Sequence, residues 1–331
     1  SEAADPIPTE LAHTLAGRQR ELGAGARAEA GARALAESGT VLIVAGQQPG
    51  LLGGLLLAFH KAAGAVNLAK RLDGRGGVRV VPAFWLASED HDLDEANRAV
   101  LLDRGGRPRR LRLDRRPDGR SLMDQPLTEG EAAAFRDEVA AMLPETERVG
   151  SLLHLLDRRP GDDVATWCAR AFTGLLGDAG LVVLEPPCLQ PHAGEALAGL
   201  LEHAAPIAEA LRTAGHALEA AGLPAPLDVP DGYVPLFLRD EVGGPRQRAQ
   251  DDASLDVSAL ASRLRAHPEL GSGDVVGRVF VEHRLLPVFA NLGGPTELAY
   301  HAQVRAAHAA VGIRYPLALP RPEATWVDAK T

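Results

Sequence analysis

Residues 41–92 read VLIVAGQQPGLLGGLLLAFHKAAGAVNLAKRLDGRGGVRVVPAFWLASEDHD. The run at 41–46 is apolar and β-branched and predicts a buried strand, and the run at 78–87 predicts a second one. Between them, 51–72 is mostly apolar and free of proline, which favours a buried helix. Strand, turn, helix and strand within about 45 residues form a βαβ unit, whose parallel strands end at the same edge of a sheet. The stretch therefore predicts an α/β fold with a doubly wound, mainly parallel sheet.

The same pattern continues on both sides of this unit. Residues 1–40 are rich in Ala, Glu and Arg with loose helical periodicity, so we expect a covering helix there. We expect a Rossmann-like core in 41–331, with connecting insertions at about 103–160 and 191–270. The elements expected further along the chain are a hairpin at 99–102 and 109–113, helices at 128–143 and 162–178, a strand at 181–185, a helical region at 191–221, and a second hairpin at 233–240 and 247–249.

Composition excludes several classes of protein. The 331 residues carry a formal net charge of -9, which gives no general attraction to nucleic acid or anionic lipid. No apolar run reaches the roughly 20 residues of a membrane span, and the acidic start lacks a signal-peptide pattern, so we expect a cytoplasmic protein. The two cysteines, Cys168 and Cys188, form no CxxC pair, which argues against a disulfide framework and structural zinc. We expect both to be small buried side chains.

The first candidate site is the motif GQQPGLLGG at 46–54, which lies between a strand and a helix. Unpaired backbone N–H groups and the helix dipole at such a turn attract carboxylate or phosphate. The adjacent amides Gln47 and Gln48 can both donate and accept, which suits a ligand with hydroxyl and carboxylate groups. The motif is neither GxGxxG nor a P-loop, so a plain glycine turn is the alternative.

The pair His60 and Lys61 stands out on the predicted helix because its neighbours are apolar. A buried lysine must find a partner or shift its pKa. We expect Lys61 to lie within hydrogen-bond reach of the turn at 89–92, or to face an anion pocket. The alternative is a Lys61 side chain that extends to solvent and a His60 with one structural hydrogen bond.

The second candidate site is the acidic turn SEDHD at 88–92, which follows the second strand and is itself followed by Asn97. Closely spaced carboxylates raise one another's pKa, so one member can act as a general base near neutral pH. A divalent metal site and a merely solvated loop are the alternatives. Since no second histidine stands at ligand spacing, we expect no metal.

A third strand-to-helix turn lies near the end of the sequence. An apolar strand in LLPVFANL leads to Gly293, Gly294 and Pro295, and the first turn of the next helix carries Glu297. Because the carboxyl ends of parallel strands share one edge, this turn is expected to face the same cleft as the other two.

These segments are similar, in order and spacing, to the signature stretches of the cysteine-adding enzymes of bacillithiol biosynthesis. The similarity is carried by GQQPGLLGG with the following HK, by FWLASEDHDLDEAN, and by SGDVVGRVF through LLPVFANLGGPTELAYHAQ. It runs from about Val41 to about Pro322. Two positions depart from the family pattern: Ala45 replaces a usual threonine, and GGL at 53–55 replaces a usual TGP.

The resemblance implies a Rossmann-like core akin to that of nucleotidyltransferases, elaborated in the family by a helical coiled coil that includes the C-terminal part. Such a helix would begin close to Thr331, so we expect the sequence to lack it and to form a monomer or weak dimer. By motif match, the family's site residues fall on Gln47, Gln48, Lys61, Glu89, Asp90, His91, Asp92, Asn97, Arg278, Gly293, Gly294, Pro295, Glu297 and Tyr300. We expect Glu89, Asp90, His91, Asp92 and Lys61 to be catalytic, and the others to bind substrate together with Gly46, Gly50, His60 and Asn291.

The implied reaction joins the carboxyl group of L-cysteine to the amine of glucosaminyl malate. Amide formation from a free carboxylate is uphill in water, so an activating nucleotide such as ATP is expected on chemical grounds. We expect the GQQ turn and Lys61 to receive a carboxylate or acyl phosphate, and Asp90 or His91 to take the proton of the amine. The rival hypotheses are a nucleotidyltransferase acting on a small carboxylic acid and a noncatalytic relative that only binds ligand.

Overall fold

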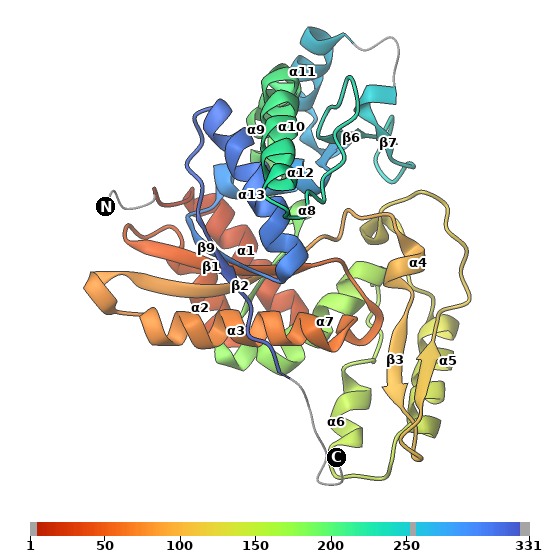
Figure 1. Ribbon diagram of the computed structural model, residues 1–331. Coiled ribbons are helices and arrows are strands. Elements are labelled where there is room, and N and C mark those ends of the chain that lie inside the picture. Colours follow the sequence, from red (N-terminus) through yellow and green to blue (C-terminus); the bar gives the residue numbers. More distant parts are fainter. Residues whose placement is uncertain (1–4, 252–255, 325–331) are drawn as a thin grey trace.

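A five-stranded parallel sheet forms the centre of the protein (Figure 1). The computed structural model describes residues 5–251 and 256–324. The strand order is β10-β9-β1-β2-β5, and the chain enters the sheet at its central strand, β1. It moves outward to β2 and β5 and then returns to the other side of β1, so the order reverses between β1 and β9. The strands are β1 (Thr40–Gln47), β2 (Arg79–Leu86), β5 (Val182–Leu184), β9 (Val288–Gly293) and β10 (Leu317–Pro320).

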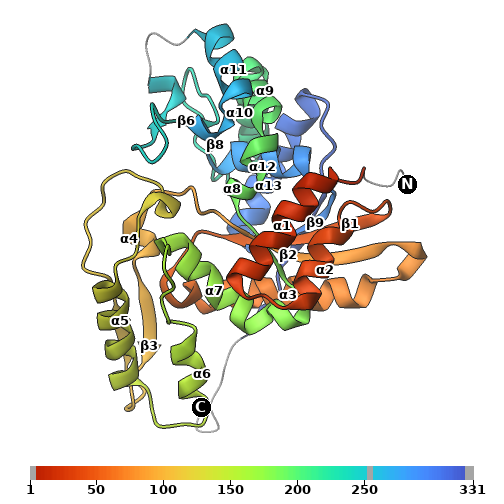
Figure 2. The ribbon, with the colours of Figure 1, turned by 180° about the vertical axis from the view of Figure 1, so that it is seen from behind.

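Helices cover both faces of this sheet, as the doubly wound expectation requires. On one face lie α1 (Thr9–Leu22) and α2 (Ala26–Ala34), which stand in front of the sheet in Figure 2. On the other face lie α3 (Leu56–Leu72) and α7 (Val164–Leu176), where the ring of Phe172 stacks on Phe84 with centroids 4.2 Å apart. The alternating apolar residues of the strands therefore contribute to two separate cores.

Two details correct the sequence expectation for these helices. The single covering helix expected in 1–40 is two helices, because Gly23 ends α1 with a φ of 78° and Gly25 precedes α2 with a φ of 82°. The helix expected from residue 51 begins at Leu56, after a 3₁₀ turn at Leu51–Gly53. The GQQ turn is therefore separated from the first helical turn of α3.

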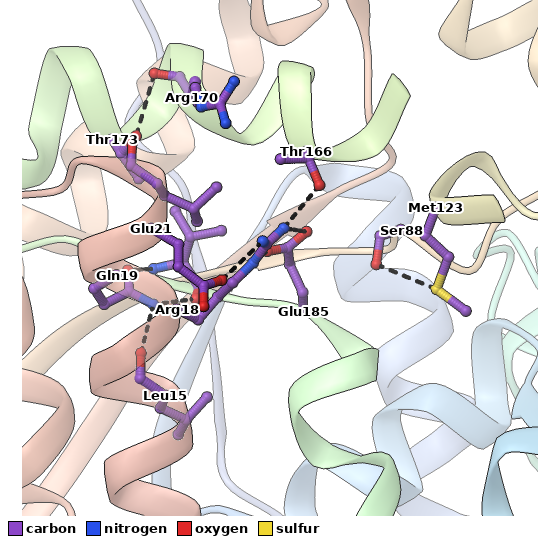
Figure 3. A network of polar contacts seen from close by, with 12 residues as sticks. Leu15, Arg18, Gln19, Glu21, Ser88, Met123, Thr166, Arg170, Thr173 and Glu185 are labelled. Atoms are coloured by element: carbon purple, nitrogen blue, oxygen red, sulfur yellow. Dashed lines mark hydrogen bonds and ion pairs between the residues drawn. The ribbon is translucent and has the colours of Figure 1, made fainter. Parts of the chain in front are cut away.

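A polar network on the α1 face anchors the edge strand β5 (Figure 3). The amide of Gln19 donates to Val183 O at 2.8 Å and accepts from Val183 N at 2.9 Å, so it replaces the missing neighbouring strand. Beside it, Arg18 Nε donates to Glu185 Oε2 at 2.7 Å, and Nη2 donates to Thr166 Oγ1 of α7 at 2.9 Å. These bonds tie α1, α7 and β5 into one unit.

The first long connection leaves β2 and packs beside the end of α7 around its own apolar cluster. It includes the predicted hairpin, and its longest helix starts with a capping box between Thr128 and Glu131. Its elements are α4 (Leu93–Ala96), β3 (Ala99–Leu102), β4 (Pro108–Leu111), α5 (Glu129–Met142) and α6 (Val149–His154). The short helix α6 was not predicted from the sequence.

The second long connection forms a helical lobe above the sheet in Figure 1. It holds the second predicted hairpin, extended by an unpredicted strand, in the order β7-β6-β8. Its elements are α8 (Pro186–Leu189), α9 (Gly194–Glu202), α10 (Ala204–Ala220), β6 (Leu236–Leu238), β7 (Gln247–Arg248), α11 (Val257–Ala266), β8 (Gly271–Gly273) and α12 (Val275–Leu285). After β9, helix α13 (Pro295–Ala310) packs against α10 with proline at its first position.

Neither cysteine is available as a nucleophile. Cys168 and Cys188 are both buried, as expected, and burial raises the pKa of the Cys188 thiol to about 12 and that of Cys168 further. In the described parts of the chain, no helix is long and apolar enough to cross a membrane. The same residues hold no group of three His, Cys, Asp or Glu side chains placed to bind a metal ion.

Candidate functional site

A cavity of about 410 Å³ lies at the carboxyl edge of the sheet, between β1 and β9. This is the point where the strand order reverses, and ligands of open α/β sheets bind in that crevice. Three strand ends and three helices supply its walls. The lining residues are Val44, Ala45, Gly46, Gln47, Gln48, Leu57, Lys61, Trp85, Ala87, Val275, Arg278, Val279, Glu282, Asn291, Leu292, Thr296, Glu297, Tyr300 and His301.

Lys61 joins the first and third predicted turns. Its side chain is buried, and Nζ donates to Gln47 Oε1 at 2.7 Å and to Gly46 O at 3.2 Å. Nζ also forms an ion pair with Glu297, whose other oxygen accepts from Gly294 N at 2.5 Å. The ammonium therefore faces the cavity with Glu297 as its ionic partner, and not a carboxylate of the acidic turn.

Two glutamine amides extend this contact across the cavity mouth. Gln47 Nε2 donates to Gln48 Oε1 at 3.2 Å, and Gln48 Nε2 donates to Glu95 Oε2 at 3.0 Å. These bonds form a chain from Lys61 through Gln47 and Gln48 to Glu95. Because Lys61 can only donate and an ionised Glu95 can only accept, they fix which end of each glutamine amide is the acceptor and which is the donor. Gly46 is required beside them, since a Cβ there would lie 3.2 Å from Trp85 O.

Helix α12 forms the opposite wall with residues at helical spacing: Val275, Arg278, Val279 and Glu282. Arg278 is held by two long contacts, from Nε to Asp274 O at 3.3 Å and from Nη2 to Asp90 Oδ2 at 3.4 Å. Burial opposes its charge, but the carboxylates of Glu89 and Asp90 raise its pKa overall. Arg278 is therefore a permanent cation in the wall.

Glu282 lies one helical turn from Arg278 and is only 6% exposed. Burial alone raises the pKa of its carboxyl group to about 8, from an ordinary value of 4.5. Glu282 Oε1 lies 3.8 Å from His283 Nε2, and burial lowers the pKa of His283 well below its usual value. A carboxyl group with this pKa is largely protonated at neutral pH and gains a charge when a cation arrives.

Residues 2–322 match the family model described as "Bacillithiol biosynthesis BshC, N-terminal Rossmann-like domain". The chain belongs to this family. A relative from Koribacter versatilis, named "Putative cysteine ligase BshC", is 34% identical over 88% of this chain and 56% of its own length. Relatives with the same name from Geobacillus thermodenitrificans and Bacillus mycoides are 29% and 26% identical over 96% and 97% of this chain. The chain spans 56 to 62% of the length of these three relatives.

In this BshC-family domain, the acidic turn lies behind Arg278 and does not form the floor of the cavity. Asp90 contacts Arg278; burial opposes its ionisation, but Arg278 and the Asp92 backbone N–H lower its pKa overall. Glu89 is buried to one side, where its backbone carbonyl accepts from Arg246, and burial raises the pKa of its carboxyl group. None of residues 89–92 is among the lining residues of this cavity, and direct contact between this turn and the amine stays a prediction.

Several other predicted site residues occupy structural positions. Asp92 is exposed and caps α4 by accepting from Glu95 N at 2.8 Å. Asn97 uses both ends of its amide on the backbone of Leu113, at 2.8 and 2.6 Å. Six further predicted residues lie outside the cavity lining: Gly50, His60, His91, Gly293, Gly294 and Pro295. Gly50 packs against Gly54 in the turn, and His60 and His91 are half-buried. Gly293 and Gly294 allow the close approach of Glu297, and Pro295 starts α13.

The cavity of this BshC-family domain also contains residues that the sequence reasoning missed, above all Glu282 and His301. Glu282 lies in the apolar run VFVEH, four positions after Arg278, so its burial had a signal similar to that of Lys61. His301 follows Tyr300, and its Nδ1 contacts the Tyr315 hydroxyl. Burial lowers the pKa of His301 to about 4, so its imidazole is neutral at pH 7.

Proposed function

We propose that this cavity binds glucosaminyl malate and that the domain takes part in joining its amine to the carboxyl group of L-cysteine. The proposal is supported by the match to a family model described as a bacillithiol biosynthesis domain, and by relatives named "Putative cysteine ligase BshC". It is also supported by the chemistry of the lining. One wall offers a cation for a carboxylate, and the same helix carries a carboxyl group for an amine.

The observation that carries the proposal is the position of Arg278. A guanidinium has five N–H donors, and the two long contacts to Asp274 and Asp90 leave donors for a ligand. The malate part of the substrate carries two carboxylates, which arginine binds with paired hydrogen bonds. Lys61 adds a second cation, although its ion pair with Glu297 compensates its charge.

The residues of this chain then supply binding, orientation and a proton acceptor. Arg278 fixes the malate end, and the amides of Gln47 and Gln48 offer bonds to sugar hydroxyls. An amine attacks an acyl carbon only in its neutral form, so a proton must leave the ammonium before the amide forms. The cysteine carboxyl group must be activated by a nucleotide such as ATP or by another energy source.

The test is formation of the cysteinyl conjugate, detected by mass, from glucosaminyl malate and cysteine supplied with ATP or cell extract. Calorimetry on the same preparation measures the binding of glucosaminyl malate alone. Arg278→Met should weaken that binding roughly 10- to 100-fold, as expected for the loss of hydrogen bonds to a charged group.

The matched control is Arg109→Met, since Arg109 is an exposed residue of β4 outside the cavity. The control should bind like the original chain. Equal affinity of the Arg278→Met and Arg109→Met proteins for glucosaminyl malate would contradict the proposed site.

A further inference from the structure

Two of the residues that line the cavity, one on α12 and one on β9, each have an unpaired acceptor oxygen. Glu282 and Asn291 are 6% and 7% exposed. Within the described parts of the chain, Glu282 Oε1 and Asn291 Oδ1 are buried and have no hydrogen-bond partner. His283 Nε2 lies 2.8 Å from Asn291 Nδ2 and 3.8 Å from Glu282 Oε1, so the two side chains meet at the same imidazole. Buried polar atoms without partners are rare in folded proteins, and each requires an explanation.

The orientation of Asn291 follows from a chain of hydrogen bonds that ends on a backbone carbonyl. His308 Nδ1 lies 3.0 Å from Val304 O, which can only accept, so Nδ1 carries the proton. Burial lowers the pKa of His308 to about 4, so its Nε2 is an acceptor at neutral pH. His283 Nδ1, 3.1 Å away, must therefore donate to it, which leaves His283 Nε2 as an acceptor.

Asn291 must then present its Nδ2 donor to His283 Nε2, at 2.8 Å. The opposite assignment of the amide would reverse every bond and leave His308 Nδ1 facing Val304 O without a proton between them. The two histidines thus fix the Nδ2 end of the Asn291 amide and leave its carbonyl oxygen without a partner, in a residue that lines the cavity. This gives the cavity lining two acceptors that need a donor with more than one N–H bond.

Among the described residues, none of the groups that interact with Glu282 is a cation. The groups coupled to it are His283 on the same helix, Tyr300 on α13 and Tyr315 beyond it, and all three are neutral at pH 7 because burial lowers the imidazole pKa and raises the phenol pKa values. Arg278, one helical turn before Glu282 on α12, interacts with Glu89 and Asp90. A cationic ligand group would therefore be the first strong partner of Glu282.

We propose that Glu282 and Asn291 form the subsite for the primary amine of the substrate, and that Glu282 accepts its proton. This inference rests on the proposed function, because it assigns the amine of the same ligand. The ammonium donates to Asn291 Oδ1 and pairs with Glu282, whose own proton leaves to solvent. One N–H bond then breaks and one O–H bond forms on Glu282, and the electron pair stays on the nitrogen as the nucleophile.

Calorimetry with two ligands tests the assignment. The ligands are glucosaminyl malate and glucosyl malate, which has a hydroxyl group in place of the amine. Titrations at pH 6.5 in two buffers of different ionisation enthalpy give both the affinity and the number of protons released. The original chain should bind the amine compound roughly 10- to 100-fold more tightly and release close to one proton per ligand.

Glu282→Gln should lose the preference and the proton release while it binds glucosyl malate like the original chain. Glu282→Asp keeps a carboxyl group and should recover part of the proton release, which a merely structural role would not predict. The control is Glu219→Gln, an exposed residue of α10, which should behave like the original chain.

The outcomes separate the two proposals. If neither compound binds the original chain, the proposed function and this inference both fail. If glucosaminyl malate binds the original chain and Glu282→Gln with equal affinity and equal proton release, the proposed function survives and the assignment of the amine subsite is wrong.

Discussion

Asp90 in the acidic turn after β2 and Glu282 on α12 hold their carboxyl groups in opposite states. In the turn, Arg278 lies 3.4 Å from Asp90 and lowers the pKa of that carboxyl group against the effect of burial. On α12, burial acts without a cation and raises the pKa of Glu282 to about 8. The charge of Asp90, which looks reactive in the sequence, is thus already compensated by Arg278.

This difference shows that partners, and not the density of charged residues, decide which group is ready for chemistry. Arg278 and Arg246 both lie against the acidic turn, and they come from segments more than 150 residues away. Glu282 has no such partner, so its protonation state changes when a ligand brings charge. The predictions below exploit this contrast between a partnered and an unpartnered carboxylate.

The largest effect is expected for Glu282→Gln on conjugate formation. The substitution keeps the shape and removes the proton acceptor, so the rate should fall by about two to four orders of magnitude. The assay measures cysteinyl conjugate by mass at saturating substrate. Glu219→Gln serves as the control, and a rate for Glu282→Gln equal to that of this control would remove the glutamate from the mechanism.

The next largest effect concerns the ion pair between Lys61 and Glu297. Lys61→Met leaves Glu297 without its buried partner and should lower the free energy of unfolding by about 3 to 5 kcal/mol, as for other broken buried pairs. Urea unfolding measures the change. The double variant Lys61→Met/Glu297→Gln removes both charges and should recover part of the loss. A single variant as stable as the original chain would mean that the pair contributes nothing.

The pH dependence of stability should carry the signature of Glu282. Its folded pKa of about 8 exceeds the ordinary value of 4.5, so the folded state binds the proton more tightly than the unfolded state. The stabilisation is fully present below about pH 4.5 and is lost as the pH rises to about 8. Relative to Glu282→Gln, the original chain should therefore lose about 2 to 4 kcal/mol of unfolding free energy between pH 5 and 8.

Urea unfolding of both proteins at the two pH values checks this prediction. The comparison with Glu282→Gln cancels the titration of groups elsewhere in the chain. A difference between the two proteins that stays constant with pH would show that Glu282 ionises normally in the fold.

How much of this site the sequence predicts depends on where each residue finds its partners. The three turns at Gly46, Asp90 and Gly293 were predicted to share one edge, and the parallel register of the sheet explains why the sequence was sufficient. The sequence does not reveal that Asp92 and Asn97 bond to nearby backbone groups, because such a polar side chain looks the same in sequence as one that awaits a ligand.

The roles of the residues in the α12 wall were harder to predict because they depend on contacts with residues far away in the sequence. The apolar run VFVEH gives a local signal that Glu282 is buried, but only the packing of α12 shows that its Oε1 has no partner among the described residues. Lys61 and Glu297 are 236 residues apart in the sequence, so no local sequence pattern predicts their ion pair. The arrangement of Asn291, His283 and His308 likewise exists only once β9, α12 and α13 meet.

The smallest effect is expected for Asp90→Asn, which acts through Arg278. Loss of the negative charge frees the guanidinium to change its position, and the affinity for glucosaminyl malate should fall about 3- to 10-fold. Calorimetry measures it against Asp137→Asn, an exposed residue of α5. A loss as large as that of Arg278→Met would instead place Asp90 in direct contact with the ligand.

The central claim is that one cavity holds the malate end on Arg278 and the amine on Glu282 and Asn291. A crystal structure with bound glucosaminyl malate tests this most directly. The account predicts the ligand between β1 and β9, with a carboxylate on the Arg278 guanidinium and the amine nitrogen within about 3 Å of Glu282 and Asn291 Oδ1. A ligand whose amine instead contacts the acidic turn at 89–92, or one bound outside this cavity, would contradict it.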